Sequence, residues 1–178
     1  TSRQASLIKR YANEVYLTFD SDGAGIMAAL RAIPMLKASG LSVKVINMKP
    51  CKDPDEFIKA MGAEEYQKRI ANARNGFMFE IDSLKAEMDV NDPEQKARFY
   101  NSVAKKLLEF EDELERNVYI DAVSGEYMIA QTNIYIFALM PYVGDLHTQA
   151  CIHSHIHRTD IRMYNVWLII SNNFLYFD

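Results

Sequence analysis

The clearest indication of the fold class is residues 14–48, EVYLTFDSDGAGIMAALRAIPMLKASGLSVKVINM. The first six are rich in β-branched and aromatic side chains and stop at Asp20, as a strand does before a turn. Apolar residues then recur at helical spacing through residues 26–38, Gly40 stands at the expected helix end, and residues 41–48 alternate like a second strand. Strand, helix and strand in this order predict a βαβ unit with parallel strands and a right-handed crossover.

The rest of the first 130 residues has mainly helical periodicity. Helices are predicted at residues 6–11, 55–61, 64–73, 77–90 and 93–116. Asp92 has the residue type of an N-cap, and Pro93 suits a first helical position. A buried helix face is expected from the apolar series Phe99, Val103, Leu107, Phe110 and Leu114. The predicted fold class is therefore α/β, with the βαβ unit followed by an α-helical subdomain.

Composition bounds the class of protein. The 178 residues are 49% hydrophobic and 25% charged, which allows a packed core and excludes global disorder. A net charge of -4 argues against a wholly basic nucleic-acid binder and leaves a local basic patch open. Two cysteines cannot form a disulfide framework, which favours a reducing, cytoplasmic setting. Because no signal-peptide pattern and no apolar run of about 20 residues is visible, we expect neither a secretory signal nor a membrane span. Because the chain opens at Thr1 without a methionine, we expect a fragment.

Composition changes near residue 130. Residues 131–178 contain no lysine but hold all four histidines. We expect an atypical tail, which is frameshifted, fused or disordered, or else an unfamiliar appendage. His153, His155 and His157 could share one face of a strand, but no acidic or cysteine partner except Cys151 stands at ligand spacing, so we expect no metal site there. Both cysteines, Cys51 and Cys151, are expected to be inert thiols.

Asp20 and Asp22 form the sharpest candidate site. They follow a predicted strand, at the end where α/β folds bind ligands, and their spacing lets both side chains face one opening. Their mutual repulsion favours a bound cation, and Mg²⁺ prefers such hard oxygen ligands. Gly23 and Gly25 permit close backbone approach, and the helix behind them offers its N-terminus to a phosphate. The alternative for this D-x-D-G motif is an acidic loop with an N-cap.

A second acidic segment, KDPDEF at residues 52–57, follows the next predicted strand. Since parallel strands end at one edge of a sheet, Asp53 and Asp55 should meet the first acidic pair there, and four carboxylates could hold one or two metal ions. The alternative is an ordinary helix start with Asp53 as N-cap. The candidate phosphate contacts are Lys52, Lys49, Lys44 and Arg31. For each of them, ordinary solvated surface charge is an equally good interpretation.

Together these motifs resemble the Toprim domain of bacterial DnaG-type DNA primases. The resemblance is carried by VYLTFDSDGAGIMAALRAIPMLKASGLSVKVINM, then KDPDEFIKAMGAEEY, with the similar lead-in TSRQASLIKRYANEV. The segment EQKARFYNSVAKKLLEFEDELERNVYI resembles the helical bundle that follows Toprim in this family. The match covers roughly residues 1–128. It divides the chain into a partial Toprim domain (1–75), a helical subdomain (76–129) and an unrecognised tail (130–178).

The resemblance implies a function and a site. Members of the family synthesise short RNA primers from ribonucleoside triphosphates on a single-stranded DNA template. It implies that Asp20 and Asp22 are catalytic and bind Mg²⁺ or Mn²⁺, with Asp53 and Asp55 in the same acidic cluster. Two ions suit such nucleotidyl transfer, because one can activate the attacking hydroxyl while the other stabilises the leaving pyrophosphate.

Three parts of the family pattern are missing. A Toprim glutamate in an E-G-Y-x-D-type motif would precede Thr1, and the zinc-binding domain and the basic N-terminal half of the polymerase core are also absent. Zinc and the replicative helicase are therefore expected to bind only through domains absent here, and no membrane contact is expected. We expect little or no primer synthesis by this chain alone.

Other functions stay open at this point. A haloacid-dehalogenase-like phosphatase also places D-x-D-G after a strand, but Ala24 stands where that family has threonine or valine. Another Toprim protein, of the nuclease or topoisomerase type, is a further alternative, as is a metal-binding module that is inert by itself. An EF-hand is disfavoured because Arg31 occupies the position of its bidentate glutamate.

Overall fold

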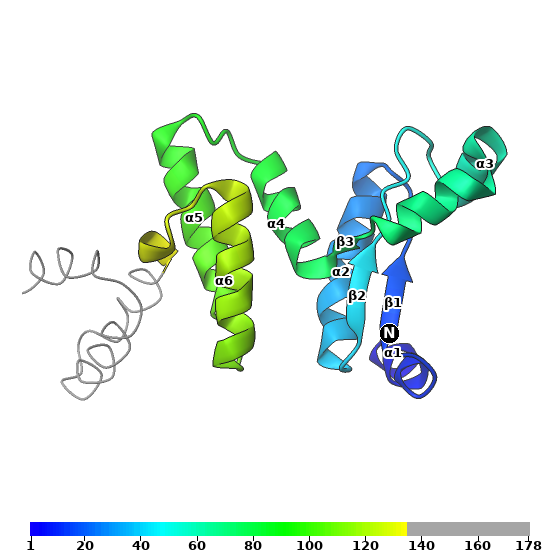
Figure 1. Ribbon diagram of the computed structural model, residues 1–178, viewed down its shortest axis with the longest axis horizontal. Coiled ribbons are helices and arrows are strands. Elements are labelled where there is room, and N and C mark those ends of the chain that lie inside the picture. Colours follow the sequence, from blue (N-terminus) through cyan, green and yellow to red (C-terminus); the bar gives the residue numbers. More distant parts are fainter. Residues whose placement is uncertain (135–178) are drawn as a thin grey trace, which may run out of the picture. The chain divides into compact units, whose positions relative to one another are not determined.

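The computed structural model describes residues 1–134, which divide between two compact units, residues 1–89 and the unit that begins at Val90 (Figure 1). The first unit contains α1 (Ser2–Lys9), β1 (Glu14–Leu17), α2 (Gly23–Ala38), β2 (Ser42–Val45), α3 (Pro54–Ala71), β3 (Arg74–Asn75) and α4 (Gly76–Ala86). The described part of the second contains α5 (Pro93–Leu107) and α6 (Glu113–Tyr127). The expectations for the tail beyond residue 134, including its histidines and Cys151, fall outside the described residues.

The predicted βαβ unit is confirmed. Strands β1 and β2 pair in parallel, with Glu14 opposite Ser42 and Leu17 opposite Val45, and α2 connects them. A third strand, β3, was not predicted. It pairs antiparallel to β2, so that the sheet has the order β1-β2-β3. Two residues are too few to produce an alternating pattern, which is why the sequence does not indicate this strand.

Helix α2 begins three residues earlier than its apolar periodicity predicts. The carboxylate of Asp22 accepts a hydrogen bond from the Gly25 N–H at 2.8 Å and so supplies the N-cap. At its other end the helix continues through Pro34 to Ala38. An N-cap of this kind satisfies the first backbone donors, so the helix can start before its apolar stripe does.

A main core forms between α2 and the sheet. It consists of the buried residues Ala5, Ile33, Leu36, Leu41, Val43 and Val45. The expected apolar face of α2 is thus only partly correct, because Met27 is 51% exposed. This core packs α2 against the strands.

Helix α3 consists of two helical halves that meet at Gly62, as the two helices predicted at residues 55–61 and 64–73 anticipate. Gly62 has φ 83° and ψ 165°, a conformation that glycine adopts without strain. Phe57 from the first half is fully buried in a second core cluster, against which Tyr66 and Ile70 from the second half pack. The bend therefore allows both halves to cover one small core.

Helix α4 lies in the first compact unit, whereas the predicted division at residue 76 places it with the helical subdomain. Phe77, Met78 and Ile81 at its start are buried. A Cβ at Gly76 would lie 3.0 Å from the backbone oxygen of Val43, which shows how closely α4 approaches β2. These contacts extend the first compact unit to Asp89.

The second unit corrects the single helix predicted at residues 93–116. Asp92 caps α5 as predicted, but α5 ends at Leu107, and α6 begins after a new N-cap, Asp112, whose carboxylate accepts the Glu115 N–H at 2.7 Å. The expected face is buried at Phe99, Val103 and Leu107, together with Ile120 and Val123 of α6. Beyond the break it fails, because Leu114 is 75% exposed and Phe110 instead stacks on Tyr119 with ring centroids 4.5 Å apart.

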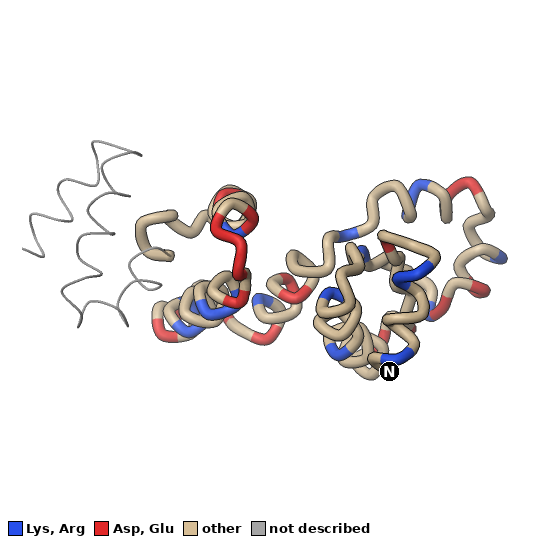
Figure 2. The backbone as a smooth tube through the Cα atoms, turned by 90° about the horizontal axis from the view of Figure 1, so that it is seen from below, with Lys and Arg blue, Asp and Glu red and all other residues tan. Residues whose placement is uncertain are grey.

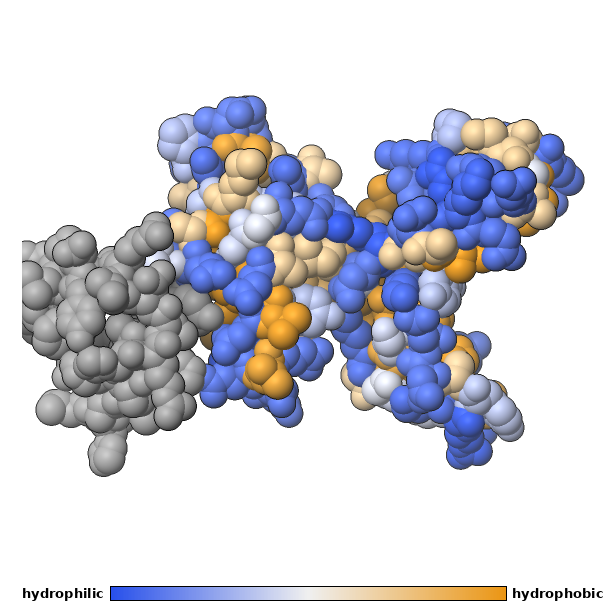
Figure 3. Space-filling model, in the orientation of Figure 1, coloured by the Kyte–Doolittle hydropathy of each residue, from blue (hydrophilic) through white to orange (hydrophobic). Residues whose placement is uncertain are grey.

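The visible face of each unit is mainly hydrophilic, with smaller apolar areas (Figure 3). Acidic and basic residues are interspersed along α3 rather than segregated by sign (Figure 2). Among residues 1–134, no helix combines the length and apolar character that crossing a membrane would require.

Candidate functional site

The two acidic loops leave the same edge of the sheet, as predicted. Because β1 and β2 are parallel, the chain leaves both strands in the same direction, and Ile46 donates its N–H to the Leu17 oxygen at 2.9 Å. Further along, Ser21 N–H donates to the Lys52 oxygen at 2.9 Å, and Ser21 Oγ donates to the Cys51 oxygen at 2.9 Å. The loop that carries Asp20 and Asp22 is therefore bonded directly to the loop that leads into α3.

Asp20 and Asp22 both present exposed carboxylates. Asp20 Oδ2 lies 4.0 Å from the Lys52 ammonium, and this pair is well solvated, since the side chains are 48% and 67% exposed. Asp22 uses one oxygen, Oδ1, as the N-cap of α2. The two carboxylates are thus at the loop surface, with one positive charge beside them.

Asp53 and Asp55 are engaged in local contacts at the start of α3. Asp53 Oδ1 accepts the Glu56 N–H at 2.8 Å, and Glu56 Oε2 accepts the Lys52 N–H at 2.7 Å. Asp55 pairs with Lys59, one turn along the helix, at 2.6 Å. The interpretation of this segment as an ordinary helix start therefore describes the observed geometry.

The expected convergence of four carboxylates is absent from this geometry. Within residues 1–134, no group of three or more histidine, cysteine, aspartate or glutamate side chains is placed to hold a metal ion. Helix capping and the i,i+4 ion pair explain why, because each draws an acid toward its own helix. Metal ligation by Asp20, Asp22, Asp53 and Asp55 stays a prediction.

Asp20 and Asp22 by themselves fit an open magnesium site. Mg²⁺ commonly keeps several waters and is held by one or two protein carboxylates together with substrate phosphates, rather than by a closed cage of side chains. Two adjacent, exposed carboxylates on one loop satisfy that requirement. A site of this kind does not need a third protein ligand in the chain.

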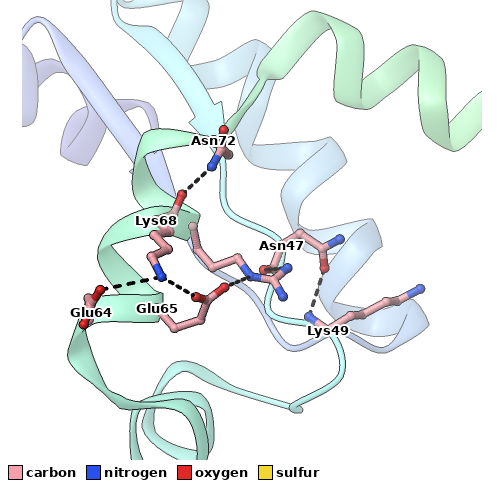
Figure 4. A network of polar contacts seen from close by, with 7 residues as sticks. Asn47, Lys49, Glu64, Glu65, Lys68 and Asn72 are labelled. Carbon is pink, nitrogen blue, oxygen red and sulfur yellow. Dashed lines mark hydrogen bonds and ion pairs between the residues drawn. The ribbon is translucent and has the colours of Figure 1, made fainter.

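The four candidate phosphate contacts have different surroundings. Lys52 lies beside Asp20, and Arg31 is exposed on α2. Lys49 donates its backbone N–H to Asn47 Oδ1 at 2.9 Å, with its side chain extending away from the other residues drawn (Figure 4). Lys44 lies on β2 and pairs with Glu14 at 2.8 Å, so it acts there as a structural charge. A phosphate role for any of them stays a prediction.

The second half of α3 supports the loop that follows β2 (Figure 4). Arg69 donates from its guanidinium to the Asn47 oxygen at 3.4 Å, approaches Glu65 at 3.9 Å and lies 5.2 Å from the centre of the Phe57 ring. Lys68 pairs with Glu64 and Glu65, at 3.6 and 3.4 Å. This network joins α3 to the loop at the residues just before KDPDEF.

The residue patterns did not indicate the contacts of Arg69 and Ser21, or the partner of Gly25. Arg69 has the residue type and spacing of any charged residue on a solvated helix, so the sequence does not indicate its contact with Asn47. Ser21 stands inside the D-x-D motif, and a hydroxyl residue between two acids is a weak indication of a second hydrogen bond. Gly25 was expected to permit close backbone approach, but its partner, the Asp20 carbonyl, could not be predicted.

Replacement of Lys44 by methionine should flatten the pH dependence of stability. The hydrogen bond from Lys44, with a second from Tyr16, holds the pKa of Glu14 below its ordinary value, and the same bond to Glu14 raises the pKa of Lys44. A depressed carboxyl pKa stabilises the fold above the unfolded-state pKa, and this stabilisation is lost as the pH falls through the folded pKa. A raised lysine pKa stabilises below the unfolded-state value and is lost as the pH rises through the folded one.

Urea unfolding midpoints measured from about pH 3 to about pH 6 check this expectation, since acid then titrates Glu14. The midpoint of the Lys44→Met variant should fall less on acidification than that of the wild type. Equal falls in both proteins would contradict a contribution from this pair.

Two families match separate parts of the chain. The family described as "Toprim-like" matches residues 1–58, and the "DnaB-helicase binding domain of primase" matches residues 77–131. A DNA primase from Clostridium acetobutylicum is 32% identical over 135 residues, which make up 76% of this chain and 22% of that protein. A DNA primase from Aquifex aeolicus is 34% identical over 100 residues, or 56% of this chain and 20% of that protein. The chain thus spans 20–22% of the length of these relatives.

Solved structures have the same fold. The crystal structure of the Aquifex aeolicus primase, with zinc-binding and RNA polymerase domains, aligns with a TM-score of 0.54 and 28% identity over 75% of this chain and 31% of that one. A DNA primase domain from Pseudomonas aeruginosa aligns with a TM-score of 0.59 and 23% identity over 78% of this chain and 44% of that one. The predicted Toprim fold class is confirmed, and the matches favour the primase resemblance over the phosphatase alternative.

Proposed function

Because the chain belongs to the bacterial DnaG-type DNA primases, we propose that its Asp20–Asp22 loop contributes to a centre for Mg²⁺-dependent nucleotidyl transfer. The reaction is RNA primer synthesis from ribonucleoside triphosphates on single-stranded DNA. The observation that carries the proposal is the direct bonding of the D-x-D loop to the loop before α3, at the carboxyl edge of the parallel strands. This edge is where α/β folds bind their ligands.

The two aspartates, Lys52 and the start of α2 have different tasks in this proposal. Asp20 and Asp22 hold the cation, which supplies charge neutralisation at the phosphate oxygens when it is bound. Lys52, whose ammonium lies 4.0 Å from Asp20, offers a positive charge to a phosphate at the same opening. The N-terminal end of α2 adds its favourable dipole for anions directly behind Asp22.

The proposal extends to the activity and partners of the chain. The resemblance assigns a further glutamate, the basic template surface and the zinc domain to segments outside this sequence, so we propose that the chain alone synthesises little or no primer. Single-stranded DNA, nucleotides and the RNA primer are the proposed ligands of the whole protein, in the cytoplasm. The replicative helicase is a proposed partner. The family matched by residues 77–131 corrects the expectation that it binds only outside this sequence, so we propose this segment as the candidate contact.

Divalent-cation binding tests the proposal. Titration with Mn²⁺, followed by the electron paramagnetic resonance signal of the free ion, should detect weak binding by the 178-residue chain. Asp20→Asn and Asp22→Asn should each weaken it by at least about tenfold, because each removes a ligand charge. Asparagine is as good an N-cap as aspartate, so the second variant removes charge while it keeps the start of α2.

Asp112→Asn is the matched control, since it makes the same change at the N-cap of α6 in the other unit. Its Mn²⁺ affinity should equal that of the wild type. Affinities that do not differ between the wild type and both loop variants would overturn the proposed site.

A further inference from the structure

We infer that Ser21 is a positioning residue whose hydroxyl joins the two acidic loops and thereby raises the cation affinity of the Asp20–Asp22 loop. The inference rests on the proposed function, which it deepens by assigning a task to the residue between the two acids. Ser21 does not act as a ligand in it. Its effect passes through the two aspartates and through Lys52.

The contacts of Ser21 reach across 30 residues of sequence. Its N–H donates to the Lys52 oxygen and its hydroxyl donates to the Cys51 oxygen, both at 2.9 Å. The acceptor segment is itself fixed, because Cys51 is buried and donates its own N–H to the Met48 oxygen at 2.9 Å. Ser21 is therefore bonded twice to a segment that rests on the second core cluster.

The D-x-D loop is held from its other side by α2. Asp22 accepts the Gly25 N–H at 2.8 Å, and a Cβ at Gly25 would lie 2.8 Å from the carbonyl carbon of Asp20. The loop thus touches the helix start through Asp20 and Asp22 and touches the second loop through Ser21. Loss of either attachment leaves the two carboxylates free to change their separation.

The backbone bond from Ser21 also involves the residue that carries the positive charge beside the site. The residue whose carbonyl accepts the Ser21 N–H is Lys52, and the ammonium of Lys52 lies 4.0 Å from Asp20 Oδ2. The next residue, Asp53, starts α3. A tight connection between the loops therefore fixes where Lys52 and Asp53 lie relative to the first acidic pair.

The hydroxyl adds to what the backbone already provides. In a Ser21→Ala variant the N–H bond to Lys52 can persist, whereas the Cys51 oxygen loses its side-chain donor. Residues that orient metal-binding carboxylates without touching the metal typically change metal affinity by about 10- to 100-fold. Since one of two bonds remains, we expect a loss near the lower end of this range.

Mn²⁺ titration of the 178-residue chain tests the inference with three variants. Ser21→Ala should bind Mn²⁺ about tenfold more weakly than the wild type. Ser21→Thr keeps a hydroxyl and should restore the affinity to within about twofold. Ser83→Ala is the matched control, because it also removes a hydroxyl that donates to a backbone oxygen at 2.9 Å, but in α4, and it should bind like the wild type.

The outcomes separate this inference from the proposed function. If Asp20→Asn weakens binding but Ser21→Ala binds like the wild type, the loop site stands and the role of Ser21 is overturned. If Ser21→Ala and Ser83→Ala lose affinity equally, or if threonine fails to restore it, the loss reflects general destabilisation and the role of Ser21 is again overturned. If neither aspartate variant alters binding, the proposed site fails and the inference falls with it.

Discussion

Gly25→Ala should lower the free energy of unfolding of the first unit by about 3 kcal/mol and remove most of its divalent-cation binding. A Cβ at this position would lie 2.8 Å from the carbonyl carbon of Asp20 and closer still to its oxygen. Backbone atoms cannot rotate away as a side chain does, so the D-x-D turn or the start of α2 would have to shift. Either shift breaks the cap that Asp22 forms with the Gly25 N–H.

Gly23→Ala is the matched control for this substitution. Gly23 also lies in the first turn of α2, but a Cβ there would meet no atom within 4 Å. It should leave stability unchanged or raise it by up to about 1 kcal/mol, since alanine reduces the freedom of the unfolded chain. Urea unfolding followed by circular dichroism compares the two. Similar midpoints for both variants would show that the close approach of α2 to Asp20 does not affect the free energy of unfolding.

Phe57→Ala should cost about 3 to 5 kcal/mol of stability in the same unit. The ring is fully buried with Ile46, Met48 and Cys51, and the guanidinium of Arg69 lies 5.2 Å from its centre. Its removal creates a cavity under the loop before α3 and deletes the surface on which Arg69 lies. The connection between Cys51 and Ser21 depends on that loop, so it should loosen as well.

Ile58→Ala supplies the comparison, because Ile58 is the next residue of the same helix and is 42% exposed. It should cost less than about 1 kcal/mol. Thermal unfolding measures both effects, and amide hydrogen exchange at Ser21, whose N–H bonds to Lys52, should accelerate only in Phe57→Ala. Equal losses for the two variants would show that the second core does not support the loop.

Residue patterns predicted the location of the candidate site but not the contacts of its carboxylates. The position of the two acidic loops at one sheet edge followed from a βαβ pattern alone, because parallel strands must end together. The same reasoning allowed four carboxylates to share a metal site, and this stays a prediction, because no group of three or more is placed to hold a metal ion in the described residues. Asp53 caps α3 and Asp55 pairs with Lys59. These contacts within a few residues compete with a shared metal site for the same carboxylate oxygens.

Errors in the helices have a similar origin. The apolar series that begins at Phe99 continues in step across the break between α5 and α6, so periodicity alone joined two helices into one. Asp112 could have indicated the new start, since it is followed three residues later by Glu115. The predicted boundary at residue 76 groups α4 with the following helices, as the family match over residues 77–131 also does, whereas its contacts lie in the first unit. An apolar helix start does not reveal which partner will bury it.

Local residue patterns were enough to predict the βαβ order, most helix starts and the edge of the sheet from which the acidic loops leave. Periodicity, capping and turn chemistry depend on residues a few positions apart, so they can be predicted from a single sequence. Three other contacts depend on long-range packing: Ser21 bonds to Cys51, Gly25 lies against Asp20, and Arg69 supports the loop at Asn47. Such contacts form because two packed cores bring distant loops to fixed positions, and no local pattern encodes those positions.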